Sequence, residues 1–186
     1  MFAILTVLTV LFTLNILTPL AYYFFMKRVA EKKPWNLSLD ERYQPKVTMI
    51  IPTFNEASII VKRLQNLEKL DYPRDKLEVI IVDSASTDGT AEIANEYIKT
   101  HPFPFRVLIL REDQRRGKAK ALNLALQYAT SDIIATSDAD SYWKPNALRM
   151  ALPFMASPEV GAVTGREVLT NPDPVSYTHL RAHETV

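Results

Sequence analysis

The sequence predicts an α/β fold, in which a mostly parallel sheet is flanked by helices and preceded by one transmembrane helix. From residue 46 onward, short apolar runs alternate with stretches that have the spacing of amphipathic helices. The apolar runs are continuous, which is typical of strands buried on both faces of a parallel sheet. The chain also opens with an uncharged stretch from Phe2 to Met26, and a helix of that length can cross a hydrocarbon core of about 30 Å.

Composition narrows the class of protein. The 186 residues carry a formal net charge of +1 and include no cysteine. The chain therefore has room for one domain with an appendage, and it can form no disulfide or cysteine-zinc site. The near-neutral charge and the lack of a base-reading motif in the sequence indicate that nucleic acid is not a partner.

The apolar amino-terminal stretch predicts that the protein contacts a membrane. Its threonine hydroxyls can bond back to the helix, and Pro19 is tolerated in membrane helices. A cleaved signal peptide fits less well, because no basic region precedes the stretch and Tyr22-Tyr23-Phe24-Phe25 offers no small-residue cleavage site. A buried hydrophobic helix is the other alternative. The cations that follow favour the cell (inner or plasma) membrane, with the amino terminus outside and the next domain in the cytoplasm. These cations are Lys27, Arg28, Lys32 and Lys33.

The chain divides by composition into four segments. They are a transmembrane helix with its basic flank (1–28), a linker (29–45), an α/β domain (46–174) and a tail (175–186). Within the domain we expect strands at 47–51, 77–82, 106–110, 133–137 and 161–164, and helices at 57–70, 90–99, 118–128 and 146–155.

The tail does not continue the α/β pattern. Its sequence from Val175 to Thr185 resembles the in-frame translation of a transposase-end sequencing adapter, so we expect the natural sequence to stop near Pro174. His179 and His183 lie four residues apart, as zinc ligands can, but an artefact of cloning or assembly explains them better. We therefore leave the tail out of the predicted fold.

Polar side chains are expected to form a site where strands end, because parallel sheets bind ligands at the carboxyl ends of their strands. Pro52 is expected to end the first strand, so that Thr53, Phe54 and Glu56 turn out over the sheet edge. Phe54 can then stack on a nucleobase, while Thr53 and Glu56 can bond to base or ribose hydroxyls. A plain strand-to-helix turn is the alternative.

The second strand is followed by Asp83 and then by Ser86-Thr87-Asp88-Gly89-Thr90. The Asp83 carboxylate lies where it can accept a hydrogen bond from a base edge or a ribose. Helix capping is enough to explain Asp88.

A basic segment, residues 115–120, enters the next predicted helix and includes Lys118. Cations and free amides at a helix start favour a diphosphate, and a solvated basic helix start is the alternative. The segment is not a Walker phosphate loop. Glu112 stands where that loop needs a glycine, and Ala119 stands where it needs a hydroxyl.

Two carboxylates, in Asp138-Ala139-Asp140, follow the apolar run 133–137. Magnesium and manganese prefer such oxygen ligands, and they leave other positions to water and substrate phosphates when only one or two carboxylates bind them. We therefore expect Asp138 and Asp140 to hold Mg²⁺ or Mn²⁺. A solvated turn is the alternative.

Together, these four segments resemble family 2 glycosyltransferases of the GT-A fold over residues 46–165. The amino-terminal membrane helix is similar to that of the membrane-bound branch, which includes poly-N-acetylglucosamine, cellulose and hyaluronan synthases. The resemblance implies that the sheet is the nucleotide-binding, N-terminal half of a GT-A fold. The segments that carry it are Pro52-Thr53-Phe54-Asn55-Glu56, Asp83 with Ser86-Thr87-Asp88-Gly89-Thr90, Gly117-Lys118-Ala119-Lys120-Ala121-Leu122-Asn123 and Asp138-Ala139-Asp140.

The resemblance implies an inverting glycosyltransferase for polysaccharide or glycolipid synthesis at the membrane. Its donor would be a nucleotide-diphospho-sugar, with a UDP-sugar expected, and its acceptor a sugar or a lipid-linked sugar. By this resemblance, Asp83 contacts the nucleotide base, Asp138 contacts the ribose or the metal, and Asp140 contacts the metal. Lys118 lies near the nucleotide or the diphosphate. The remaining residues implied to bind the donor are Pro52, Thr53, Phe54 and Glu56.

The catalytic base of such enzymes is an acid in the second half of the domain, commonly in a Thr/Glu-Asp motif, with a Gln-x-x-Arg-Trp motif beyond it in processive members. Neither motif occurs between the acid pair and Pro174, in residues 141–174, so we expect the acceptor half to be missing and assign no catalytic residue. The alternatives are a membrane-tethered nucleotide-binding module without catalysis and a sugar nucleotidyltransferase, which should have a glycine-rich phosphate loop after its first strand. A phosphatase fits poorly, because its Asp-x-Asp normally follows an early strand.

Overall fold

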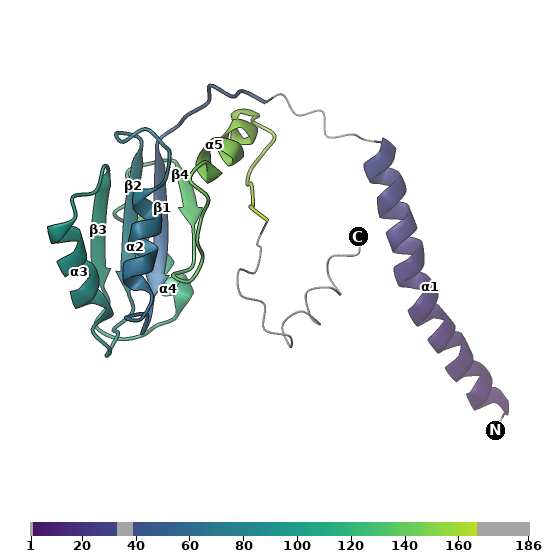
Figure 1. The fold of residues 1–186 in the computed structure, drawn as a ribbon. Helices are drawn as coiled ribbons and strands as arrows, with labels where there is room; N and C mark the ends of the chain where they lie inside the picture. Colours follow the sequence, from purple (N-terminus) through teal and green to yellow (C-terminus); the bar gives the residue numbers. More distant parts are fainter. Residues whose placement is uncertain (1, 33–38, 167–186) are drawn as a thin grey trace. The chain divides into compact units, whose positions relative to one another are not determined.

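The computed structural model describes residues 2–32 and 39–166 of the chain. The chain divides into two units, Met1–Ser38 and Leu39–Val186 (Figure 1), and each is described by itself. The predicted non-native tail, residues 175–186, lies outside the described residues.

The first unit is a single helix, α1 (Phe2–Lys32), whose segment Ile4–Val29 has the length and composition of a membrane span, with a mean hydropathy of 2.0. Its polar side chains do not interrupt it, because each donates a hydrogen bond to the carbonyl four residues earlier at 2.7–3.0 Å, which reduces the cost of placing it in lipid. The helix is therefore compatible with membrane anchoring. These residues are Thr6, Thr9, Thr13, Asn15 and Thr18.

The second unit is built on a parallel four-stranded sheet with the strand order β3-β2-β1-β4. Val47 at the start of β1 lies opposite Leu77 of β2 on one side and Ile133 of β4 on the other. The strands are β1 (Val47–Thr53), β2 (Leu77–Asp83), β3 (Arg106–Arg111) and β4 (Ile133–Thr136).

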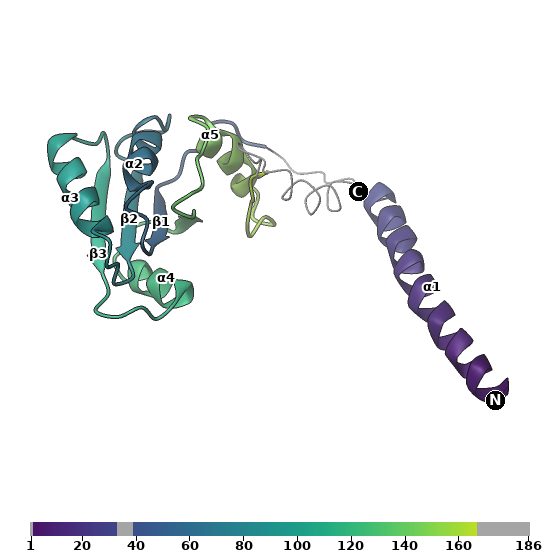
Figure 2. The same ribbon diagram turned by 60° about the horizontal axis from the view of Figure 1, so that its bottom comes forward.

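Helices cover both faces of this sheet, with α2 and α3 on one face and α4 on the other (Figures 1 and 2). Alternate residues of each central strand face the two layers, so that Met49 and Ile51 pack toward α2 whereas Ile50 packs toward α4. Burial on both faces explains the continuous apolar runs, and the predicted α/β fold is confirmed. The helices are α2 (Ile60–Glu68), α3 (Thr90–Thr100), α4 (Lys118–Leu126), α5 (Ala147–Ala151) and the 3₁₀ helix η1 (Leu152–Ala156).

The strand order reverses at β1. The chain adds β2 and β3 on one side of β1 and then returns to place β4 on the other side. Because crossovers between parallel strands are right-handed, this reversal puts α4 on the face opposite α2 and α3. In open α/β sheets, ligands bind outside the carboxyl ends of the strands at such a reversal, which here lies between β1 and β4.

Pro52 does not end the first strand as predicted, because β1 continues through Pro52 to Thr53. In a parallel strand, the N–H and C=O of one residue face the same neighbour. The carbonyl of Ile50 accepts a hydrogen bond from the Ser137 amide at 3.1 Å, so the positions of Ile50 and Pro52 both face the β4 side. Since β4 ends at Thr136, the missing N–H of Pro52 removes no ladder hydrogen bond.

The predicted strand at 161–164 is wrong, because these residues are exposed and pair with no strand in the part of the chain that the structure describes. The predicted helix at 146–155 is divided into α5 and η1. Pro153 lies at the start of η1 and has no N–H to continue the α-helical hydrogen bonding, which accounts for the tighter turn.

At the amino edge of the sheet, the buried carboxylate of Glu78 on β2 joins neighbouring segments through hydrogen bonds. It accepts hydrogen bonds from the Thr48 hydroxyl at 2.5 Å, from the amide and hydroxyl of Thr130 at 2.7 and 2.8 Å, and from Arg106 at 2.9 Å. Burial acts to raise the pKa of Glu78, but these donors and the Arg106 charge outweigh it and lower the pKa below its ordinary value. The carboxylate therefore links β1, β2, β3 and the segment before β4.

We expect Glu78→Gln to lower the free energy of unfolding at pH 7 by about 1–3 kcal/mol, the contribution of hydrogen bonds to a charged group. A carboxylate with a lowered pKa in the folded protein stabilises it above its unfolded pKa of about 4.3 and loses that effect as the pH falls through the folded pKa. The difference between wild type and variant should therefore shrink between pH 6 and pH 3 in denaturation experiments. Glu159→Gln, at an exposed position, is the control, and a pH-independent difference for Glu78→Gln would contradict the prediction.

Candidate active site

The loops that follow β1 and β2 are held together by side-chain hydrogen bonds to backbone amides. Four bonds of 2.9–3.0 Å join them, and each satisfies an amide that the turn leaves without a backbone partner. The resulting unit is a pair of clamped loops at the carboxyl edge. The bonds run from the Asn55 amide to Ser86 Oγ, from the Thr87 amide to Asn55 Oδ1, from the Glu56 amide to Thr90 Oγ1 and from the Ala57 amide to Asp88 Oδ2.

Both clamped loops contain strained backbone. Asn55 has φ +55° and Ala85 has φ +58°, and they are the two non-glycine residues with positive φ in the described part of the chain. Asparagine tolerates this left-handed conformation because its short side chain bonds locally, whereas alanine has no such compensation. Strain of this kind persists where the surrounding contacts fix the backbone, and it clusters at functional sites.

Asp88 does more than the capping that the sequence predicts. Its Oδ1 accepts from the amide and hydroxyl of Thr90 at 3.1 and 2.5 Å, while Oδ2 accepts from Ala57 in the other loop at 3.0 Å. The bonds from Thr90 and Ala57 lower the pKa of Asp88. Asp88 is therefore a link between the two loops as well as a cap for α3.

We expect Asp88→Ala to speed hydrogen exchange at the amides of Ala57 and Thr90 by about 2- to 10-fold, because each amide loses an acceptor worth roughly 0.5–1.5 kcal/mol. Asp132→Ala is the matched control, since Asp132 is exposed and makes no hydrogen bond or ion pair within the described residues. Residue-resolved exchange measured by mass spectrometry or NMR is the test. Unchanged protection at both amides would show that the clamp does not form in solution.

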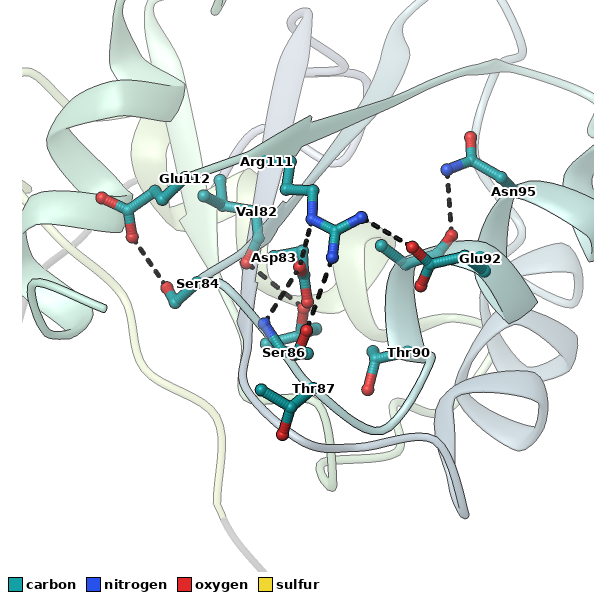
Figure 3. A network of polar contacts seen from close by, with 12 residues as sticks. Val82, Asp83, Ser84, Ser86, Thr87, Thr90, Glu92, Asn95, Arg111 and Glu112 are labelled. Carbon is teal, nitrogen blue, oxygen red and sulfur yellow. Dashed lines mark hydrogen bonds and ion pairs between the residues drawn. The ribbon is translucent and has the colours of Figure 1, made fainter. Parts of the chain in front are cut away.

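Asp83 lies at the carboxyl end of β2 with its side chain 1% exposed (Figure 3). One oxygen, Oδ2, accepts from the Ser86 amide at 3.2 Å and lies 3.6 Å from Nε of Arg111. The other oxygen, Oδ1, is buried without a hydrogen-bond partner among the described residues. A buried acceptor of this kind is costly unless a donor reaches it.

The end of β3 supports this acid with two residues that the sequence analysis did not single out. Arg111 reaches Asp83, the carbonyl of Ser86 and Glu92 of α3 (Figure 3). Glu112 is buried, accepts from Ser84 Oγ at 2.9 Å and lies 3.7 Å from Nε of Arg116. The sequence gives little indication that Arg111 and Glu112 belong to the site, because charged residues at the end of an edge strand usually face solvent.

The basic loop before α4 contacts both neighbouring segments. The guanidinium of Arg115 lies 4.0 Å from the centroid of the Phe54 ring, within cation–π range. Gly117 has φ +88°, which an L side chain would resist. Lys118 opens α4 and forms an ion pair with Asp138, and both side chains are more than half exposed. The structure therefore brings Lys118 and the acid pair together.

The acid pair projects from a turn anchored by its middle residue. Ala139 is 4% exposed and packs in the core layer of α2, whereas Asp138 and Asp140 on either side are exposed. Burial raises the pKa of Glu56, and the negative charges of Asp140 and Asp88 raise it further. Glu56 is therefore within electrostatic range of Asp140, one of the two predicted metal ligands.

The donor set fits a hard divalent cation. Asp138 and Asp140 offer exposed carboxylate oxygens, and no group of three or more acidic, histidine or cysteine residues in the described ranges could enclose a metal. Mg²⁺ and Mn²⁺ suit such a site, because they take one or two carboxylates together with water and substrate phosphates.

The remaining predicted residue, Thr53, is buried, and its hydroxyl donates to the Val82 carbonyl at 3.2 Å. Its donor is therefore used within the sheet. The roles predicted for the site residues stay predictions, although the structure places their segments on one edge of the sheet.

Arg63 of α2 is a further residue that the sequence analysis missed. It is 0% exposed, and burial lowers its pKa to about 10 despite the opposing influence of Tyr142 and Asp140. A signal was available, because Arg63 shares the helical face of Ile60, Leu64 and Leu67, all of them core residues. A charge among such positions needs a specific partner.

Solved structures similar to this chain define its class. The mannosyltransferase PcManGT from Pyrobaculum calidifontis, in complex with GDP-Man and Mn²⁺, matches with a TM-score of 0.71 and 48% identity, over 77% of this chain and 41% of that chain. S. aureus TarS 1-349 in complex with UDP-GlcNAc matches with a TM-score of 0.51 and 29% identity, over 56% of this chain and 30% of that chain. The fold is that of a GT-A-type glycosyltransferase.

Residues 48–185 match the sequence profile of the family described as Glycosyl transferase family 2, and the chain belongs to this family. It is 34% identical to the poly-beta-1,6-N-acetyl-D-glucosamine synthase of Staphylococcus epidermidis, over 81% of this chain and 35% of that protein. It is 35% identical to the beta-monoglucosyldiacylglycerol synthase of Synechocystis sp., over 78% of this chain and 31% of that protein. The chain thus spans about a third of the length of these relatives.

Proposed function

We propose that residues 46–174 are the donor-binding part of an inverting, metal-dependent glycosyltransferase that uses a nucleoside-diphospho-sugar. The observation that carries the proposal is the acid pair at the strand-order reversal, with Lys118 of the α4 start bonded to Asp138. A cation and a row of free helix amides beside a pair of carboxylates suit a metal-bound diphosphate. The Mn²⁺ and GDP-Man of the similar mannosyltransferase support the proposal.

The nucleoside would lie over the clamped loops. Asp83 offers a buried acceptor oxygen without a partner among the described residues, to which a base N–H would donate, while Thr53 pairs with Asp83 across the sheet and Phe54 follows at the end of β1. The two similar complexes contain GDP-Man and UDP-GlcNAc. We propose a UDP-sugar as the donor, and the transfer assay below compares UDP-sugars with GDP-sugars.

The diphosphate would lie between Lys118 and the acid pair. Asp138 and Asp140 would hold Mg²⁺ or Mn²⁺, which when bound supplies positive charge that offsets the charge of the departing diphosphate. Lys118 would bind a phosphate oxygen in place of its bond to Asp138, and the α4 amides would add donors.

The reaction proposed is a direct displacement. An acceptor hydroxyl oxygen bonds to the anomeric carbon on the side opposite the diphosphate, the bond from that carbon to the diphosphate oxygen breaks, and nucleoside diphosphate leaves with the electron pair. The hydroxyl proton must pass to a base, and we assign that role to none of the residues described at this edge. A membrane-tethered module without catalysis would bind the donor and transfer nothing.

The acceptor is proposed to be a sugar or a lipid-linked sugar at the membrane. The apolar helix α1 supports anchoring, and the names of the relatives refer to a polysaccharide and to a glycosylated lipid. Lys27 and Arg28 lie near the carboxyl end of α1, which supports a cytoplasmic position for the sheet domain by the positive-inside tendency.

We expect Asp140→Ala in the intact gene product to lower metal-dependent sugar transfer by at least about 100-fold, because the metal contributes several kcal/mol of charge stabilisation. The melting temperature should change little, since Asp140 is exposed. Asp132→Ala, at the other end of β4, is the control and should retain activity. The assay follows radiolabelled sugar from UDP- and GDP-donors with Mn²⁺. Full activity of Asp140→Ala would refute the metal assignment.

We also expect the 186-residue chain on its own to aggregate or to be cleaved rapidly, in contrast to the intact gene product in the same detergent. Exposed apolar side chains gather after β4, including Met150 at 64% and Tyr142 at 46%, and β4 is an edge strand. Uncovered apolar surface and open strand edges promote association. Size-exclusion chromatography and limited proteolysis are the measurements. A monodisperse, protease-resistant chain would contradict this prediction, because the exposed apolar surface would then be stable in contact with solvent.

A further inference from the structure

We infer that Arg63 is a positioning residue that fixes the turn carrying Asp138 and Asp140 in the geometry that binds metal. This inference rests on the proposed function, because the metal assignment gives the turn its role. The turn is residues 138–142, between the end of β4 and Trp143.

One end of the turn is held by Arg63 directly. Its Nη2 donates to Ser137 Oγ at 2.8 Å, and Ser137 immediately precedes the acid pair. The Ser137 amide in turn donates to the Ile50 carbonyl of β1 at 3.1 Å. The start of the turn is therefore fixed to α2 and to the sheet.

The other end is held through Asn66, one helical turn further along α2. Arg63 Nη1 donates to Asn66 Oδ1 at 2.7 Å, which orients the amide. Asn66 then accepts from the Trp143 amide at 2.9 Å and donates to the Trp143 carbonyl at 2.8 Å. Both ends of the acid-bearing turn are thus bonded to one face of one helix.

The energetics favour a positional role over a stabilising one. Arg63 is fully buried, forms no ion pair within the described residues, and its Nε has no hydrogen-bond partner there. An apolar residue of similar volume would satisfy the neighbouring core at less cost. The contribution that an apolar side chain cannot make is the two-pronged bond to Ser137 and Asn66.

Geometry and charge predict opposite effects on metal affinity. A positive charge near Asp140 opposes the binding of a cation, so removing it would tighten binding if Arg63 acted by charge alone. If it acts by holding the turn, loss of the fork weakens binding whether or not charge is kept. Lysine keeps the charge but lacks the planar fork that reaches two acceptors.

The test compares Arg63→Met and Arg63→Lys with wild type in the intact gene product, with Mn²⁺ as the probe and a nucleoside diphosphate present. We expect both variants to raise the Mn²⁺ dissociation constant about 10- to 100-fold, as loss of residues that orient metal ligands does. Free Mn²⁺ is measured by electron paramagnetic resonance. Ser137→Ala, which removes one prong, should give a smaller increase.

The matched control is Arg106→Met, which removes the ion pair with Glu78 at the opposite edge of the sheet. This variant should have a lower melting temperature but unchanged Mn²⁺ affinity. It would thereby show that a loss of stability alone does not weaken Mn²⁺ binding. If Arg63→Met does not fold, Arg63→Lys and Ser137→Ala decide the question.

Unchanged or tighter Mn²⁺ binding in the folded Arg63 variants would overturn the inference and leave the proposed function intact. Failure of the wild-type protein to bind Mn²⁺ would overturn both. Weaker binding in Arg63→Met with wild-type affinity in Arg63→Lys would also overturn it, because a side chain without the planar fork would then hold the turn equally well.

Discussion

The reversal of strand order at β1 is the constraint on which the arrangement of this domain depends. Because crossovers are right-handed, a chain that builds β2 and β3 on one side and returns to the other must use both faces of the sheet for its helices. The return places the acid-bearing end of β4 beside the aromatic end of β1, although more than eighty residues of sequence lie between them. The site is therefore a consequence of topology before it is a consequence of any single motif.

Side chains, more than backbone ladders, give this edge its definite shape. The loops after β1 and β2 exchange bonds between amides and the side chains of Asn55, Ser86, Asp88 and Thr90. These bonds satisfy donors that would otherwise need water, and they compensate for strained backbone at the same positions. The polar residues of the second motif thus support the first loop, and the two motifs form one structural unit.

Local patterns in the sequence predicted the fold well where burial alone decides it. Continuous apolar runs located β1 to β4 within two residues, and the spacing of apolar positions located α3 and α4. The errors arose where a long-range neighbour decides the outcome. Pro52 remains in β1 because β4 ends before it, and residues 161–164 form no strand because none pairs with them among the described residues. Arg63 was missed for a similar reason, since Ser137, the partner that ties it to the acid-bearing turn, lies 74 residues away in the sequence.

The charges at the acid pair divide into an exposed set and a buried set with different physical properties. Lys118 and Asp138 are each more than half exposed, and exposed ion pairs contribute only about 0–1 kcal/mol, so the pair can separate readily when a phosphate and a cation arrive. Arg63 and Ser137 are buried, where an unsatisfied group is expensive, so their bond resists separation. For the proposed function, in which a charged donor binds and leaves in each cycle, the exposed ion pair would allow exchange, while the buried network would keep the carboxylates in place for the next ligand.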